Sequence, residues 1–157
     1  MSLSSSIIYL FVLLISVQFA TAQKLVTAAE VTPALLKETC DNAYIEIIEV
    51  KDTYIKIKNT YNVYLDIDSS KRFVTFSSVY NLVEGASKKD ALELVNKLNT
   101  EVALIKTYYS ESTNTITYFY YFWTEGGFTQ KSLISSLRLY KTALDLSLDK
   151  DTAKLIK

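Results

Sequence analysis

The chain has 157 residues, of which 49% are hydrophobic, 13% aromatic and 22% charged, and its 17 basic and 17 acidic side chains cancel. This balance is typical of a globular protein and not of a disordered one, and without a net positive field we expect no nucleic-acid partner. Histidine is absent and Cys40 is the single cysteine, so histidine general bases, His/Cys zinc sites and an intramolecular disulfide are excluded, and we predict no cofactor.

The chain begins with an apolar segment, residues 7–17, that is shorter than the roughly 20 residues a membrane-spanning helix requires. Ala20 and Ala22 follow it, and both are small residues of the kind that a signal peptidase accommodates. We therefore predict a signal peptide over residues 1–22, cleaved between Ala22 and Gln23, and a secreted or periplasmic protein without membrane contact after cleavage. No Lys or Arg precedes the apolar segment, which leaves an uncleaved anchor as the alternative.

A first helix is predicted after a short tether, residues 23–31. Thr32 is suited to cap it and Pro33 to its first position, and it should end at about Asn42. Its apolar residues recur every three and four positions and make one buried stripe: Leu35, Leu36, Thr39, Cys40 and Ala43. On this stripe Cys40 is expected to be a small buried hydrophobe, and a dimer linked through it is the alternative.

Residues 44–83 change to a period of two, with many β-branched and aromatic residues, which indicates strands. Short polar turns separate the segments, so consecutive strands should pair antiparallel as a meander of three or four strands. The segments read YIEIIEV, TYIKIK, YNVYLDID and RFVTFSSVY.

A second helix is predicted from the capping-box spacing of Ser87 and Asp90, and it should end at about Asn99. Its expected apolar stripe consists of Ala91, Leu92, Val95 and Leu98. Two further strands, residues 101–110 and 114–124, follow it and form a long hairpin across a polar turn.

The last predicted element is a third helix, capped by Thr129 after a turn that contains Gly126 and Gly127. These glycines lack the Lys-Ser/Thr pair of a phosphate-binding loop and serve the backbone. The apolar stripe of the helix is Leu133, Leu137, Tyr140, Leu144 and Leu148, and the polar residues 149–157 fray or extend it. The order α-β-β-β(-β)-α-β-β-α predicts a single α+β domain over residues 32–157, with helices on one face of an antiparallel sheet.

Several phrases within this order resemble the YbjN domain, a group often labelled bacterial sensory transduction regulators. They are KDALELVNKLN after the Ser87 cap, VALIKTYYSESTNTITYFYYF, and EGGFTQKSLISSLRLYKTAL, within residues 44–148. The most specific piece is the Glu125-Gly126-Gly127 turn followed by Thr129 and an amphipathic helix. The resemblance implies a fold similar to type III secretion chaperones and a small interaction or regulatory domain without a catalytic motif. Members are commonly cytoplasmic, so cytoplasmic roles transfer poorly to a chain with an export leader.

The most unusual feature of the sequence is a run of six aromatic residues, 118–123, in one predicted strand. Alternation assigns Ile116, Tyr118, Tyr120 and Phe122 to the helix-covered core, and Thr115, Thr117, Phe119, Tyr121 and Trp123 to the other face. We predict that Phe119, Tyr121 and Trp123 form a protein-interaction face, because exposed aromatics commonly mark protein contacts. The alternatives are a strand covered on both faces within the chain and the core of a homodimer. Strand addition at an unprotected sheet edge is a further possibility.

Asp66 and Asp68 stand two residues apart on one strand face, before Ser69 and Ser70. A metal site or a carboxylate acid/base pair is conceivable there, but a calcium loop needs more oxygen ligands. We interpret the two aspartates as a solvated strand end and turn, and we predict no catalytic, metal-binding or cofactor-binding residue.

Lys56, Lys58 and Tyr54 share a strand and could contact a phosphate. Glu46 and Glu49 precede them in the sequence and argue against a basic patch, so a solvated sheet face is the preferred interpretation.

Taken together, these patterns favour an exported, non-enzymatic protein that binds an unidentified polypeptide, or a second copy of itself, through its sheet. The alternatives are a small-ligand sensor, which requires a cavity between helices and sheet, and a carboxylate-dependent enzyme.

Overall fold

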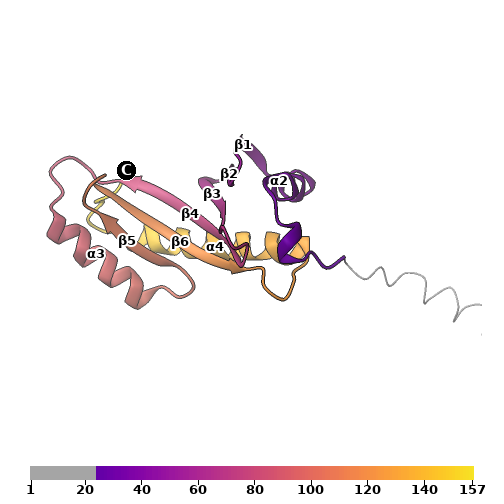
Figure 1. The fold of residues 1–157 in the computed structure, drawn as a ribbon. Coiled ribbons are helices and arrows are strands. Elements are labelled where there is room, and N and C mark those ends of the chain that lie inside the picture. Colours follow the sequence, from indigo (N-terminus) through magenta and orange to yellow (C-terminus); the bar gives the residue numbers. More distant parts are fainter. Residues whose placement is uncertain (1–23) are drawn as a thin grey trace, which may run out of the picture.

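The computed structural model describes residues 24–157 and has the predicted α+β architecture (Figure 1). The helices are η1 (Ala28–Glu30), α2 (Pro33–Asn42), α3 (Lys88–Glu101) and α4 (Gln130–Asp149). The strands are β1 (Glu46–Val50), β2 (Tyr54–Asn59), β3 (Tyr61–Ile67), β4 (Phe73–Asn81), β5 (Lys106–Ser110) and β6 (Thr115–Trp123). The predicted signal peptide and its cleavage residues Ala20, Ala22 and Gln23 lie outside the described residues. None of the helices in residues 24–157 is long and apolar enough to span a bilayer.

The strands form one antiparallel sheet in the order β1-β2-β3-β4-β6-β5. Strands β1 to β4 are the predicted meander, and its tight turns place Thr60 and Lys71 at φ 66° and 57°. The chain then leaves the sheet to form α3 and returns as the β5–β6 hairpin, which adds to the sheet through β6. The aromatic strand β6 is therefore internal, between β4 and β5 (Figure 1).

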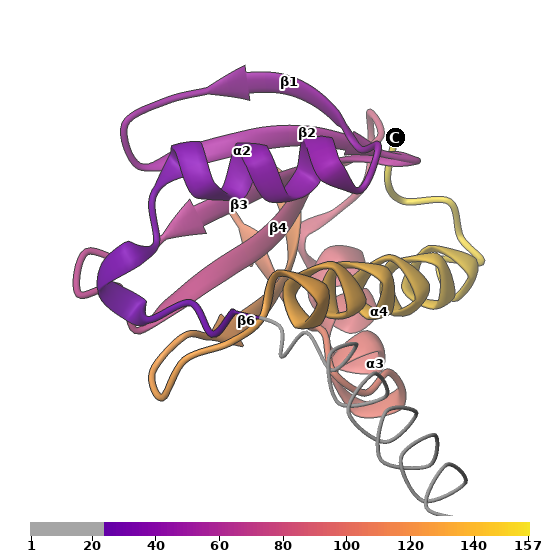
Figure 2. The same cartoon turned by 90° about the vertical axis from the view of Figure 1, so that its right-hand side faces the viewer.

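The helices pack on one face of the sheet, as predicted. Figure 2 shows α2 and α4 in front of the strands. Tyr140 of α4 donates a hydrogen bond from its hydroxyl to the Tyr118 carbonyl of β6, at 3.0 Å. The Thr107 hydroxyl of β5 donates to the Val95 carbonyl of α3 at 3.4 Å. The core between helices and sheet includes Leu36, Ile55, Ile57, Leu65, Phe76, Leu98, Ile116, Tyr118, Leu133, Leu137 and Tyr140, all buried.

All three predicted helix caps are present. The Leu35, Asp90 and Ser132 N–H groups donate to the side-chain oxygens of Thr32, Ser87 and Thr129, at 3.2, 3.1 and 3.1 Å respectively. Each bond satisfies a backbone N–H that has no partner within its helix, so these residues fix where the helices begin.

The buried face of α3 differs from the prediction. Leu94 is buried and Leu92 is 47% exposed, because Ala91, Leu94 and Leu98 point toward the sheet. The helix also continues to Glu101, two residues beyond the predicted end. Strand β5 consequently begins only at Lys106, since the backbone is left-handed at Leu104 (φ 72°) and cannot continue an extended strand there.

The segment predicted as a tether is packed against the domain. Val26 and Phe128 exchange two backbone hydrogen bonds, from Val26 N to Phe128 O at 2.7 Å and from Phe128 N to Val26 O at 2.9 Å. The side chains of Val26 and Val31 are buried. Residues 24–31 therefore belong to the folded unit.

The C-terminal residues neither fray nor extend α4. Helix α4 ends at Asp149, and the chain turns back along the end of β4. Val83 N donates to Leu155 O at 2.8 Å, and Lys157 N donates to Asn81 O at 3.0 Å. The buried Asp151 carboxylate accepts the Leu155 and Ile156 N–H groups at 3.0 and 3.1 Å, which fixes the turn.

Cys40 is buried in the core on α2, in agreement with its interpretation as a small hydrophobe. Burial, with a smaller contribution from Asp41, raises the pKa of the thiol to about 12. A disulfide between two chains at this position would require the thiol to leave the core, so a dimer linked through Cys40 is not supported.

Candidate protein-interaction surface

The face of the sheet opposite the helices, called the outer face below, carries the side chains that alternate with the core residues. No helix in residues 24–157 covers it, and in Figure 1 α4 lies behind β6. From β2 to β5 its members are Tyr54, Lys56, Lys58, Asn62, Tyr64, Asp66, Phe73, Thr75, Ser77, Val79, Thr117, Phe119, Tyr121, Trp123, Lys106 and Tyr108.

The aromatic run of β6 divides between the two faces as its alternation predicts. Tyr118 and Phe122 are buried beneath the helices. Tyr121 and Trp123 point to the outer face and are 44% and 58% exposed, and Phe119 beside them is half-buried. The described residues therefore do not cover this strand on both faces, which removes one of the alternatives.

Cross-strand neighbours extend these residues into a continuous aromatic strip, defined as Phe73, Tyr108, Phe119, Tyr121 and Trp123. Ring centroids are 4.9 Å apart for Phe73 and Tyr121, 5.3 Å for Phe119 and Tyr121, 5.7 Å for Phe73 and Trp123, and 5.9 Å for Tyr108 and Phe119. All four pairs are edge-to-face, a favoured geometry for aromatic rings. Phe73 and Tyr108 were not predicted as part of this surface, because assigning them requires knowing that β4 and β5 flank β6.

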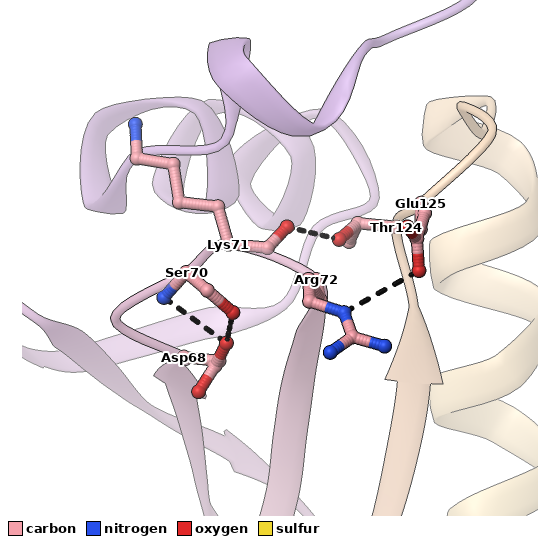
Figure 3. A network of polar contacts seen from close by, with 6 residues as sticks. All are labelled: Asp68, Ser70, Lys71, Arg72, Thr124 and Glu125. Carbon is pink, nitrogen blue, oxygen red and sulfur yellow. Dashed lines mark hydrogen bonds and ion pairs between the residues drawn. The ribbon is translucent and has the colours of Figure 1, made fainter.

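A polar network fixes one end of the aromatic strip (Figure 3). The buried Thr124 donates from its N–H to the Arg72 carbonyl at 2.9 Å and from its hydroxyl to the Lys71 carbonyl at 2.5 Å. The Arg72 Nε donates to Glu125 Oε2 at 3.4 Å, and the guanidinium lies 6.0 Å from the Trp123 ring. The turn after β3 is thereby tied to the end of β6, so Trp123 is presented from a defined backbone.

Asp66 and Asp68 do not form a joint site. Asp68 lies beyond the end of β3 and accepts hydrogen bonds from the Ser70 hydroxyl and, at 3.1 Å, the Ser70 N–H (Figure 3). The Ser70 hydroxyl is the main reason that the pKa of Asp68 is lowered. Asp66 stays on the outer face between Tyr54 and Thr75 of the adjacent strands, and burial raises its pKa. Within residues 24–157 no three His, Cys, Asp or Glu side chains are grouped to hold a metal ion.

The lysines of β2 lie in a surface of mixed charge. Lys58 is in register with Glu46, and Lys56 with Glu49. Glu49 also accepts a hydrogen bond from the Tyr54 hydroxyl at 3.1 Å. This part of the outer face has no excess of positive charge, which agrees with its interpretation as a solvated sheet face and not as a phosphate site.

Both edges of the sheet are protected against strand addition. On β5, the Thr107 N–H donates to Asn99 Oδ1 at 2.8 Å, and Asn99 Nδ2 donates to the Thr107 carbonyl at 2.9 Å. This amide of α3 takes the place of a neighbouring strand. On the opposite edge, β1 has five residues and a bulge between Ile47 and Glu49, and Glu49 pairs with Lys51 at 3.0 Å. Short, bulged and charged edges disfavour pairing with another chain, so the structure favours the outer face over the edges.

The space between helices and sheet is well filled. The cavity there is lined by Leu104, Ile105, Tyr120, Leu139, Tyr140 and Ala143 and has a volume of about 20 Å³, room for one water molecule. A hollow of about 430 Å³ lies on the surface between α2 and α4, beside the polar side chains of Gln130, Lys131 and Arg138. Ligand pockets usually measure about 300–1,000 Å³ and are mainly apolar, so neither hollow matches the cavity that a small-ligand sensor requires.

The comparisons with known proteins agree with the fold. Residues 49–150 match the family model of YbjN, described as "Putative bacterial sensory transduction regulator". The crystal structure of YbjN, "a putative transcription regulator from E. coli", superposes with a TM-score of 0.67 at 12% identity, covering 79% of this chain and 94% of that one. At this identity the likeness establishes the fold alone. No curated protein matches the chain. Because the family model covers more than half of its residues, the chain belongs to the YbjN family.

Proposed function

We propose that the protein is an exported, non-enzymatic interaction module that binds a polypeptide through the outer face of its sheet. The observation that carries the proposal is the aromatic strip, which lies exposed on a surface that no helix in residues 24–157 covers. The description of the family as a regulator is consistent with an interaction role.

The physical basis is the large area that an aromatic side chain contributes at a low cost in rotamer entropy. Tyr108, Tyr121 and Trp123 are 51%, 44% and 58% exposed. At roughly 150–250 Å² for each buried aromatic side chain, their exposed parts offer roughly 300 Å². The largest apolar patch on a typical soluble monomer measures about 300–600 Å² and is often functional. The fixed turn at Arg72 and Thr124 limits the ordering required on binding.

An enzymatic role has less support. The sequence contains no histidine, and the two candidate carboxylates are separated, since Asp68 is bonded to its own turn while Asp66 stands on the open sheet. A carboxylate acid/base mechanism needs two groups that face one substrate in a pocket. A sensor of small apolar ligands is likewise disfavoured by the filled core.

Export is the second part of the proposal, and the apolar segment with Ala20 and Ala22 supports it. Cleavage before Gln23 would leave every residue of the described fold in place, including Val26. Amino-terminal sequencing of the protein from the exported fraction should begin at Gln23. Recovery of only the uncleaved chain from a membrane fraction would overturn this part.

The interaction role is tested with a triple variant, Phe119→Ser, Tyr121→Ser and Trp123→Ser. The probe is a reduced, alkylated and fluorescently labelled polypeptide without tryptophan, and binding is followed by anisotropy. Removing three aromatic contacts should weaken association by about 100-fold or more, because truncating a well-packed aromatic typically costs at least about 2 kcal/mol. The variant should retain the far-ultraviolet circular dichroism and cooperative unfolding of the wild type.

A matched control removes three exposed apolar side chains elsewhere, by substituting serine for Tyr44, Leu139 and Leu146, which are 98%, 56% and 47% exposed. This control should bind the probe as the wild type does. Equal loss in both variants would show non-specific apolar adhesion. An unfolded triple variant would show that the three aromatics are needed for the core, and the proposal would lose its main support.

A further inference from the structure

We propose that the polypeptide bound by the outer face is a second copy of the chain, and that two copies pack sheet on sheet about a two-fold axis that runs along the strands between β4 and β6. This inference rests on the proposed function and names its partner. Strands β3, β4, β6 and β5 are consecutive in the sheet (Figure 1). Such an axis lays β4 of each copy over β6 of the other, and β3 over β5.

The first argument is that β4 and β6 are complementary in size. The register pairs the small Thr75 with the large Tyr121, and Ser77 with Phe119. Rotation about the proposed axis therefore places the Tyr121 and Phe119 rings of one copy over Thr75 and Ser77 of its partner. Such alternation of large and small side chains lets two facing sheets interdigitate at a spacing of about 10 Å.

The alternation of large and small side chains does not extend to the ends of these strands. Val79 is 50% exposed and pairs with the buried Thr117, which has nearly the same size, so the rotation sets two small side chains opposite each other there. At the other end Phe73 pairs with Trp123, and the axis sets aromatic against aromatic. The complementarity in size therefore rests on two pairs, Thr75 with Tyr121 and Ser77 with Phe119.

The second argument is that the outer face is complementary to itself in charge. Asp66 on β3 and Lys106 on β5 make no hydrogen bond or ion pair with any side chain in the described part of the chain. Lys106 of β5 is in register with Phe119 of β6, and Tyr64 of β3 is in register with Ser77 of β4. The rotation that places Ser77 over Phe119 also moves β3 over β5 at the same level. The axis therefore brings the partner's Lys106 over Tyr64, two residues and roughly 7 Å along the strand from Asp66.

Asp66 lies within the reach of a lysine side chain from that position, and the two-fold axis forms this pair twice. An acidic group on one flank of the aromatic strip and a basic group on the other is the arrangement that an isologous interface requires. In the single chain the half-exposed Asp66 carboxylate has no cationic partner among the described residues. In the proposed dimer it would gain one, the Lys106 ammonium group of the second copy.

The third argument is area. A standard interface buries about 800 Å² per partner around an apolar centre with a polar rim. The exposed parts of Tyr108, Tyr121 and Trp123 supply roughly 300 Å² of that centre. Half-buried Phe73 and Phe119, with the polar residues of β2, β3 and β5, surround it. The aromatic strip therefore supplies the apolar centre that an interface of about 800 Å² per partner requires, and the surrounding residues of β2, β3 and β5 would form its polar rim.

The mass of the purified protein, measured by sedimentation equilibrium over a dilution series, tests the proposal together with a charge exchange. The wild type should be a dimer that dissociates on dilution. The variants Asp66→Lys and Lys106→Glu should each weaken dimerisation by about tenfold or more, because each places like charges opposite one another. The double variant, which exchanges the two charges, should return to within about threefold of the wild type.

Two further variants make the result independent of any loss of folding. Ser77→Tyr fills the space assigned to the partner's Phe119 and should yield a folded monomer that still binds the unfolded polypeptide probe. Lys131→Glu, a charge reversal on α4 away from the outer face, should leave the dimer unchanged.

A wild type that stays monomeric at every concentration overturns the inference, as does a double variant no better than its single parents. If that monomer binds the unfolded probe through Phe119, Tyr121 and Trp123, the proposed function stands and its partner is a different chain. If it binds neither the probe nor itself, both proposals fail.

Discussion

Asn99 closes the β5 edge of the sheet, and removing its amide is a sharp test of that role. The amide exchanges two hydrogen bonds with Thr107, at 2.8 and 2.9 Å, and Thr107 is 5% exposed. Asn99→Ala leaves a backbone N–H and a C=O without partners. Because each buried, unsatisfied group costs about 1–3 kcal/mol, we expect the free energy of unfolding to fall by about 2–4 kcal/mol.

The assay is urea denaturation followed by circular dichroism. With a slope of about 1–3 kcal/mol per molar urea, the expected loss lowers the midpoint by about 1–2 M. Asn96→Ala is the matched control, since Asn96 is exposed on the same helix and its side-chain amide makes no hydrogen bond within residues 24–157. Both changes alter helix propensity equally, so the difference between the two variants isolates the bonds to Thr107.

Asn99→Ala should also accelerate exchange of the Thr107 amide hydrogen and promote self-association at high concentration, because an open strand edge pairs with other chains. A variant that unfolds within about 0.5 kcal/mol of Asn96→Ala, with the Thr107 amide still protected, would refute the argument that a side chain blocks this edge.

Three other predictions follow from single side chains. Tyr140→Phe removes the 3.0 Å hydrogen bond to the Tyr118 carbonyl and should lower the free energy of unfolding by about 1–2 kcal/mol. Tyr118→Phe should leave the free energy of unfolding unchanged, because the buried Tyr118 hydroxyl has no partner among the described residues. A larger loss of stability for Tyr118→Phe than for Tyr140→Phe in thermal unfolding would contradict this prediction. Cys40, whose pKa burial raises to about 12, should react with a thiol reagent at pH 8 only in urea, and rapid labelling of the native protein would refute its burial. Hydrogen bonds from the Thr27 N–H, the Thr27 hydroxyl and Lys24 lower the pKa of Glu30 from 4.5 to about 2. The ionised Glu30 carboxylate therefore stabilises the fold above pH 4.5, and this contribution is lost as the pH falls toward 2. Glu30→Gln should be less stable than the wild type at pH 6 and equal to it near pH 2, and a difference in urea midpoint that does not change with pH would exclude this carboxylate as the cause.

Local patterns in the sequence were sufficient for most of the fold, because they depend on neighbouring residues alone. Thr32, Ser87 and Thr129 cap the helices as predicted, and the division of β6 into a core face and an outer face follows from a side-chain period of two. In α3 the helical spacing predicts that Leu92 is buried, whereas Leu94 is the buried residue. Both leucines lie at helical spacing from other apolar residues, and only the position of β5 determines which one faces the core.

Contacts between distant segments were beyond local reasoning. Phe73 belongs to the aromatic strip only because β6 pairs with β4, across an insertion that contains α3 and β5. The amide of Asn99 at the β5 edge and the return of Leu155 to Val83 likewise depend on where whole elements pack. The sequence pattern predicts the place of Asp68 in a turn, whereas the isolation of Asp66 on the outer face depends on the register of three strands.

Trp123 is the single tryptophan of the chain and lies on the outer face, so its fluorescence reports on the proposed binding surface directly. The decisive measurement is acrylamide quenching of Trp123 emission over a dilution series of the protein. If the outer face binds a second copy, quenching should be weak at high protein concentration and rise several-fold on dilution, with a red shift at the concentration where the mass falls to that of one chain. Addition of the unfolded polypeptide probe to the dilute protein should protect Trp123 again if the face also accepts other chains. Quenching that is unchanged by both dilution and probe would contradict the claim that the aromatic strip is a binding surface.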